Sequence, residues 1–372
     1  GERAQGPRHM GAWAATPSSP PRALGAMLLW LALVPGVGVA LSTWLLRWDW
    51  YTDCAAPARP LLPAEDVAAL DVVHVAYSAD DNTFPGLLVS MLSLARHLRQ
   101  PQQCVIHIIV AEADMAQAQR VAECFRQELL PELPGLPAVA LHAARPLPAD
   151  LGHLVRCPKP FPHLSLSLPL WSYFYLHEYL PDAPRALYLD TDTVVRADVG
   201  PLYRMRMAHA LAAAPESPER LQLMEALQRL DLPNRRLNLT PSGFFNTGVL
   251  LLDLARWRAR RVPEATLALL EELRAAPQLH LAWADQEVLN VLFQGGDLDL
   301  LDWRWNLLDM AAPRLVPRRC AEEAKIYHFQ GCPAYKAGNR KYWQRDRRWC
   351  CGYNEDLLAP HLARRQCRAL AP

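Results

Sequence analysis

Short apolar runs alternate with longer amphipathic segments through the middle of the chain. The apolar runs, which are typical of strands buried on both faces, lie at 72–77, 104–110, 137–142, 186–189 and 249–252. Residues 85–98 and 115–130 repeat apolar side chains at helical spacing, and Pro85 suits the first turn of a helix. The aromatic-rich stretch 167–180 predicts a further helix. Strands that alternate with helices in this way predict an α/β fold with parallel pairing.

The most apolar segment of the chain lies near its N-terminus. Residues 24–46, LGAMLLWLALVPGVGVALSTWLL, contain no charged side chain. At about 1.5 Å per residue, a helix of this length covers the ~30 Å hydrocarbon core of a bilayer. Arginines precede the run and two aspartates follow it closely, so the positive-inside rule predicts a cytosolic N-terminus and a lumenal body. A cleaved signal peptide is the alternative, although its apolar region is normally shorter.

This pattern divides the chain into five parts. We predict a cytosolic tail (1–23), a transmembrane signal-anchor (24–46), a Pro/Ala-rich stem (47–70), an α/β domain (71–345) and a cysteine-containing tail (346–372). The α/β domain would then lie inside the secretory pathway.

Charge and cysteine content narrow the class of protein. The 39 lysines and arginines nearly cancel the 38 aspartates and glutamates, so no strong field would attract nucleic acid, and that class of partner is excluded. The nine cysteines do not follow a zinc-binding spacing, and their predicted use is in disulfides of an oxidising lumen. Because nine is odd, one thiol would stay free or pair between chains.

Two carboxylates follow the apolar run 186–189 directly, in Asp190-Thr191-Asp192. Carboxylates two residues apart at the end of a strand can converge on one hard divalent cation, which prefers oxygen ligands. Such a cation can bridge a nucleotide diphosphate and neutralise the charge of the leaving group. Most Asp-x-Asp pairs are solvated turns, but the apolar residues on both sides favour a metal site here.

Two other polar clusters also follow apolar runs. Ser78-Ala79-Asp80-Asp81-Asn82 suits hydrogen bonds to a nucleobase and ribose, and equally suits a turn with a helix cap. His328 offers a third metal ligand, and two carboxylates with a histidine suit Mn²⁺ better than Ca²⁺. The alternative for His328 is a hydrogen bond within the core. Gly331 would let the backbone approach a phosphate closely.

Amide side chains mark two further segments. Asn246, at the start of the run that leads into 249–252, offers a donor and an acceptor to sugar hydroxyls, or belongs to a strand-entry turn. Asp285 suits binding of a hydroxyl, and Gln286 suits a position under an anomeric carbon. Asp285 equally suits the N-cap of the helix after it.

Taken in order, these segments resemble glycosyltransferase family 8. The matching segments are SADDN (78–82), LYLDTDTVVR (187–196) with VGPLY (199–203), FFNTGVLLLD (244–253), DQEVLN (285–290) with LFQGG (292–296), and YHFQG (327–331). The resemblance covers 71–345. It implies a GT-A fold, a Rossmann-like mixed and mostly parallel sheet flanked by helices.

The resemblance also implies an activity and a site. The protein would be a retaining glycosyltransferase that moves a hexose or pentose from a UDP-sugar to a glycan, glycoprotein or glycolipid, with an α-linked product. Mn²⁺ would be held by Asp190, Asp192 and His328, and the catalytic residues would be Gln286 and Asp285. The donor would be bound by Ser78, Asp80, Asp81, Asn82, Asp190, Thr191, Asp192, Asn246, Gly248, Gly331 and Lys336. A single-pass type II place in the Golgi or endoplasmic reticulum membrane would follow.

Two positions depart from the family pattern. Tyr173 stands where many relatives carry an arginine that helps to hold the donor. Ala334 stands where the family usually has a lysine after the metal-binding histidine, and the nearest lysine is Lys336. A lysine stem is long and flexible enough to substitute from that position, as are the side chains of Arg340 and Lys341.

Two alternatives stay open at this point. An inverting transferase of the same fold needs a carboxylate base near the acceptor hydroxyl. The candidate bases are Glu216, Glu219 and Asp285. The other alternative is a lumenal binding protein without catalytic activity, which the two departures suggest.

Overall fold

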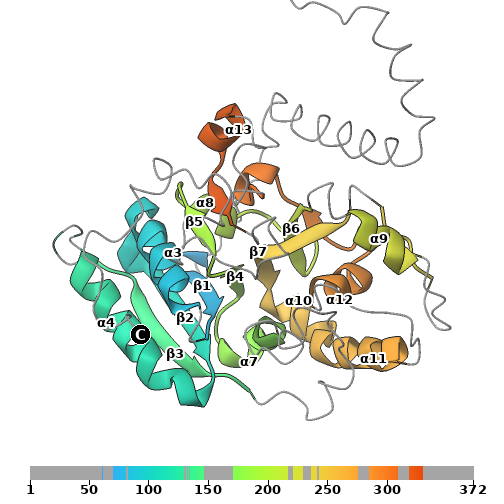
Figure 1. Ribbon diagram of the computed structural model, residues 1–372, viewed down its shortest axis with the longest axis horizontal. Coiled ribbons are helices and arrows are strands. Elements are labelled where there is room, and N and C mark those ends of the chain that lie inside the picture. Colours follow the sequence, from blue (N-terminus) through green and yellow to red (C-terminus); the bar gives the residue numbers. More distant parts are fainter. Residues whose placement is uncertain are drawn as a thin grey trace, which may run out of the picture. The chain divides into compact units, whose positions relative to one another are not determined.

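Figure 1 shows the computed structural model of the chain. The structure describes residues 61, 70–80, 83–129, 131, 133, 135–145, 171–216, 221–228, 236–240, 243–274, 285–308 and 318–329. The predicted membrane anchor at 24–46 lies outside these residues. Within the described part of the chain, no helix is long and apolar enough to cross a bilayer.

A seven-stranded mixed sheet forms the centre of the fold. Its strands stand in the order β3 (Ala138–Ala143), β2 (Cys104–Val110), β1 (Val73–Ser78), β4 (Arg185–Leu189), β7 (Phe245–Asp253), β6 (Leu211–Pro215) and β8 (Asp299–Leu300). Pairing is parallel from β3 to β4, whereas β7 runs antiparallel to both β4 and β6. The expected mixed, mostly parallel sheet is therefore present.

Side chains on both faces of this sheet are buried, as the apolar runs predicted. On β4, Leu187 and Leu189 pack with α3 (Phe84–His97) and α4 (Met115–Leu129) on one face. Ala186 and Tyr188 face a second core on the other side. That core also contains residues of η6 (Tyr173–Tyr175), α7 (Leu176–Tyr179), α9 (Leu221–Gln228), α10 (Leu254–Ala259), α11 (Val262–Arg274) and α12 (Asp285–Leu292). Figure 1 shows α3 and α4 beside β1, β2 and β3, and α10, α11 and α12 on the side of β7.

The remaining described elements are short. They are η3 (Pro101–Gln103), η4 (Glu112–Asp114), β5 (Thr193–Val195), α8 (Gly200–Tyr203), η8 (Trp303–Trp305), α13 (Arg318–Glu323) and β9 (Ile326–His328). The strands β5 and β9 form a separate antiparallel pair, in which Thr193 stands opposite His328. This small sheet brings the end of the described chain against the end of β4.

The segment predicted as one helix over 167–180 differs from that prediction within its described part. Residues 173–175 form a 3-10 turn, and α7 begins only at Leu176. Every side chain from Trp171 to Leu176 is buried. A regular helix at the surface would expose some of these side chains to solvent. The 3-10 turn at 173–175 instead occurs where all of them are buried.

Three histidines form a row across the first three strands. Nδ1 of His74 lies 3.0 Å from Nε2 of His107, and Nδ1 of His107 lies 3.0 Å from Nε2 of His142. Burial and, to a smaller extent, the neighbouring His142 and His74 lower the pKa of His107 to about 3. Burial also lowers the pKa values of His74 and His142. The row is therefore uncharged at neutral pH.

The cysteines that the structure describes are used in two ways. Cys124 and Cys320 are disulfide-bonded, whereas Cys104 is a free, buried thiol. The expectation that disulfides form is confirmed for these two residues.

Candidate metal and donor site

The pair of carboxylates lies at the end of β4, where this strand leaves the sheet. The backbone N–H of Asp190 donates to the carbonyl of Gly248 on β7 at 2.8 Å, which continues the β4–β7 ladder by one residue. Thr191 and Asp192 are buried, whereas the Asp190 side chain is 38% exposed. One carboxylate is thus held inside the protein and the other is accessible to a ligand.

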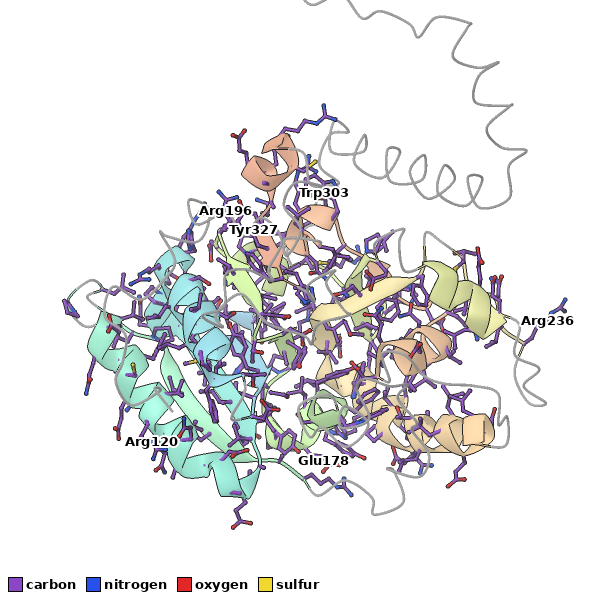
Figure 2. The ribbon with its side chains drawn as sticks, in the orientation of Figure 1. Arg120, Glu178, Arg196, Arg236, Trp303 and Tyr327 are labelled. Atoms are coloured by element: carbon purple, nitrogen blue, oxygen red, sulfur yellow. The ribbon has the colours of Figure 1, made fainter. Side chains whose placement is uncertain are left out.

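His328 reaches the same place from β9. Its backbone N–H donates to Leu307, and the next N–H, that of Phe329, donates to the carbonyl of Asp192 at 2.9 Å. Beside it, the guanidinium carbon of Arg196 lies over the ring of Tyr327, 4.5 Å from the ring centroid. Figure 2 labels both residues. Pairing of β5 with β9 therefore fixes the backbone of His328 next to that of Asp192.

The side chains of these three residues converge on one point. Nε2 of His328 lies 3.2 Å from an oxygen of Asp192 and 3.6 Å from an oxygen of Asp190. Ligand atoms of the three side chains all lie within 4.8 Å of one another. Two carboxylates and an imidazole nitrogen at this spacing form a possible site for a divalent cation.

Gly248 makes room for the imidazole of His328. A Cβ atom at this position would lie 2.1 Å from Cε1 of His328 and 2.6 Å from its Nδ1. The ring of His328 therefore packs directly on the backbone of β7.

Next to the histidine, a buried network joins Asn246, Gln286 and Glu216. Nδ2 of Asn246 donates to Glu216 at 3.0 Å and to Oε1 of Gln286 at 3.1 Å. Nε2 of Gln286 donates to the same Glu216 oxygen at 2.7 Å. The backbone N–H of Thr247 donates to Oε1 of Gln286 at 3.3 Å. Both polar atoms of the Gln286 amide are thus held in place by the protein.

Asp285 is the first residue of α12, and Tyr173 lies beside it. The hydroxyl of Tyr173 donates to Oδ2 of Asp285 at 2.8 Å. Burial raises the pKa of Asp285 to about 8; the hydrogen bond from Tyr173 opposes this rise, and nearby Asp190 adds to it. A neutral tyrosine leaves this carboxyl group with less electrostatic stabilisation than an arginine would provide.

The end of β1 also lies close to the carboxylates. Oγ of Ser78 lies 2.5 Å from Oγ of Ser172. Asp80 forms a turn in which its side chain accepts a hydrogen bond from Oγ1 of Thr83 at 2.9 Å. The turn expected as an alternative for this cluster is therefore present, and its role in binding a nucleoside stays a prediction. Asp81, Asn82, Gly331 and Lys336 lie outside the described residues.

Three residues of the site could not be placed from their sequence pattern. Asn306 lies between His328 and Asn246, Glu216 accepts from two amides, and Asn290 bonds the backbone of Phe245 with both of its side-chain polar atoms. Glu216 was expected only as a candidate base. Glu216 and Asn306 belong to segments with little pattern of their own. Asn290 lies in the matched segment DQEVLN, but the pattern of that segment does not show what its side chain contacts.

Comparison with known proteins gives a consistent family assignment. The profile of Glycosyl transferase family 8 matches residues 159–346. A probable galacturonosyltransferase-like 3 of Arabidopsis thaliana is 25% identical over 257 residues, which are 66% of this chain and 68% of that protein. A lipopolysaccharide 1,2-glucosyltransferase of Escherichia coli (strain K12) is 33% identical over 116 residues, or 31% of each chain.

Solved structures share the fold. The galactosyltransferase LgtC, in complex with donor and acceptor sugar analogues, aligns with a TM-score of 0.51 at 22% identity and covers 78% of this chain and 95% of its own. The bifunctional glycosyltransferase WbbM aligns with a TM-score of 0.50 at 16% identity, over 82% of this chain and 51% of its own. The match to the family profile covers half of the chain, and the sheet has the corresponding architecture. The chain therefore belongs to glycosyltransferase family 8 and is a glycosyltransferase with the GT-A fold.

Proposed function

We propose that the protein is a retaining, Mn²⁺-dependent transferase that uses a UDP-sugar as donor. The observation that carries this proposal is the convergence of Asp190, Asp192 and His328. Two hard oxygen ligands with one imidazole suit Mn²⁺, and a cation held by these three residues would be able to bind a diphosphate as well. A bound Mn²⁺ would supply Lewis-acid stabilisation of the departing nucleoside diphosphate.

The surrounding residues then have distinct tasks. Asp192 and His328, both buried, would hold the cation rigidly, while the more exposed Asp190 faces the donor. Ser78 and Asp80 lie at the end of β1, where a parallel strand of this kind of sheet presents its ligand-binding edge. Asp81, Asn82, Thr191, Gly248, Gly331 and Lys336 remain proposed contacts of the donor.

The state of Glu216 argues against one of the three candidate bases of an inverting reaction, and so favours retention of configuration. Its carboxylate is 1% exposed and accepts hydrogen bonds from two amides, so it is poorly placed to take a proton from an acceptor hydroxyl. An amide at Gln286 is a poor nucleophile. We therefore propose that Gln286 and Asp285 orient the donor sugar and the acceptor, and that the departing phosphate assists attack from the same face.

The domain organisation and the cellular location of the protein are also proposals. The residues 71–345 would form the catalytic domain, carried by the anchor 24–46 and the stem 47–70 and followed by the tail 346–372. This arrangement places the domain in the lumen of the Golgi or endoplasmic reticulum, where glycan, glycoprotein or glycolipid acceptors are available.

A UDP-release assay with Mn²⁺ tests the donor. We expect one of UDP-xylose, UDP-glucose, UDP-galactose and UDP-galacturonic acid to be hydrolysed well above the others. The last is included because a relative is named as a probable galacturonosyltransferase-like protein. Release of UDP from none of them, with Mn²⁺ in excess, would contradict the proposed donor class.

Asp192→Asn tests the metal site. Because the carboxylate is buried beside His328, its loss should lower Mn²⁺-dependent UDP release by about a hundredfold or more. Asp297→Asn is the matched control, since Asp297 is exposed and pairs only with Arg260 among the described residues. Equal activity of the two variants would exclude Asp192 as a ligand.

A further inference from the structure

Asn306 is a buried side chain that touches the candidate metal site without facing the metal position. It follows η8 directly and is 2% exposed. Its Oδ1 lies 3.0 Å from Nδ1 of His328, and its Nδ2 lies 2.9 Å from Oδ1 of Asn246. It is therefore the bridge between the histidine and the amide network.

The backbone N–H of Gly248 fixes the direction of the hydrogen bonds in this row. It donates to Oδ1 of Asn246 at 2.9 Å, so the atom that Asn246 turns towards Asn306 is an acceptor. Asn306 must therefore present its NH₂ group to Asn246 and its carbonyl oxygen to His328. Since a carbonyl oxygen only accepts, Nδ1 of His328 carries a proton.

This assignment determines what the other ring nitrogen does. In the neutral imidazole, a proton on Nδ1 leaves a lone pair on Nε2. That atom is the one that lies 3.2 Å from Asp192 and 3.6 Å from Asp190. The lone pair of His328 and two carboxylates then face one point, which is the arrangement that a divalent cation requires.

We propose that Asn306 is a positioning residue that holds His328 in the Nδ1–H form and ties the metal centre to the amides of Asn246 and Gln286. The inference rests on the metal role proposed for His328. Residues that bond the second ring nitrogen of a metal-binding histidine fix its tautomer and ring orientation. Mutation of such a residue typically lowers metal affinity or activity by roughly 10- to 100-fold.

The second half of the proposal concerns the amides. Asn246 donates to Oε1 of Gln286, and both amides donate to Glu216. A shift of Asn246 would therefore also shift Gln286, because the two side chains are joined directly by a hydrogen bond. Asn306 thus links the residues that hold the cation to the residue proposed to face the reacting sugar.

Two substitutions separate these tasks. Asn306→Asp keeps an acceptor for Nδ1–H of His328 but turns a second acceptor towards Oδ1 of Asn246. Asn306→Leu has a similar volume and removes both bonds. Mn²⁺ affinity is measured by calorimetry on the full-length chain without nucleotide, and UDP release is measured separately. Thr266→Val, a buried polar change on α11, serves as the control.

We expect the two variants to behave differently. Asn306→Leu should weaken Mn²⁺ binding about tenfold or more, whereas Asn306→Asp should keep it within about threefold of the wild type and still lose about tenfold in UDP release. If the substitutions only disturbed the fold, the Mn²⁺ affinity would fall in both variants. The fall in each would then follow the decrease in its melting temperature. If the leucine variant does not fold, Asn306→Ala removes the same acceptor and gives the same comparison.

Each other result has a definite meaning. Wild-type Mn²⁺ affinity in Asn306→Leu, or an equally large loss of affinity in Asn306→Asp, would overturn the role of Asn306 towards His328. Normal UDP release by Asn306→Asp would overturn the link to Asn246. If the wild-type chain itself binds no Mn²⁺, the proposed function fails, and this result is distinguishable because it does not depend on position 306.

Discussion

At the scale of single residues, Gly248 leaves the space that the imidazole of His328 occupies, although its position within a strand does not suggest this role. Its carbonyl accepts from Asp190 and its N–H donates to Asn246, so the backbone at this position touches both halves of the site. The imidazole of His328 occupies the space where a side chain would begin. A residue expected from the family resemblance to bind the donor thus also determines where a candidate metal ligand can lie.

Gly248→Ala should therefore displace His328. The added Cβ would lie 2.1 Å from Cε1, so the ring must leave the position in which its Nε2 faces Asp190 and Asp192. The Mn²⁺ affinity should therefore fall about tenfold or more in a calorimetric titration. Gly135→Ala is the control, because its Cβ would approach no atom closer than 3.4 Å. An unchanged Mn²⁺ affinity in Gly248→Ala would argue against His328 as a ligand.

At the scale of elements, the apolar runs predicted the central strands well. The bounds of β2 are those expected, and those of β1, β3 and β4 are within one residue, because a strand buried on both faces needs a continuous apolar sequence. β7 begins four residues earlier than predicted. Its first four residues, FNTG, do not form an apolar run. Long-range hydrogen bonds hold them in the strand, such as those between the Asn290 side chain and the backbone of Phe245.

The strands that complete the site were harder to predict. β5 and β9 have three residues each, which are too few to show any periodicity. Their pairing places Thr193 opposite His328, a residue far away in the sequence. The motifs around Asp190, Asp192 and His328 could be found in the sequence because their residue types are unusual after apolar runs. Asn306 and Glu216 could not, since an isolated Asn or Glu next to a turn has many ordinary explanations.

The histidine row of β1, β2 and β3 predicts a dependence of stability on pH. The folded protein holds His107 with a pKa of about 3, whereas an unfolded histidine has a pKa near 6.5. The contribution of His107 to the free energy of unfolding is therefore complete above about pH 6.5. As the pH falls below about 6.5, this contribution decreases by about 1.4 kcal/mol per pH unit.

His107→Gln tests this dependence, because glutamine keeps polar atoms on β2 but does not titrate. The melting temperature of the wild type should fall more steeply between pH 7.5 and pH 5.0 than that of His107→Gln. His209→Gln, outside the row, should keep the wild-type slope. Parallel slopes for the wild type and His107→Gln would show that the row does not bind protons on unfolding.

At the scale of the whole molecule, two features support the proposed lumenal position of the α/β domain. Cys124 and Cys320 are disulfide-bonded, and disulfides persist in oxidising compartments. The uncharged run 24–46 with arginines before it predicts a cytosolic N-terminus and export of the chain beyond residue 46. Neither feature depends on the other, because the disulfides belong to the folded domain, whereas the apolar run would act during membrane insertion.

Whether the run 24–46 remains in the mature protein decides between an anchor and a cleaved signal. An anchor predicts that the full-length chain resists extraction from membranes at alkaline pH, that an N-terminal epitope is digested by protease added to intact microsomes, and that residues 71–345 are protected. Deletion of 24–46 should abolish membrane insertion and leave the chain in the cytosol, where the disulfides of Cys124 and Cys320 would not form. A mature N-terminus after residue 46, found by sequencing the purified protein, would overturn the anchor. It would leave the lumenal position of the domain intact, because a signal peptide exports its body in the same direction.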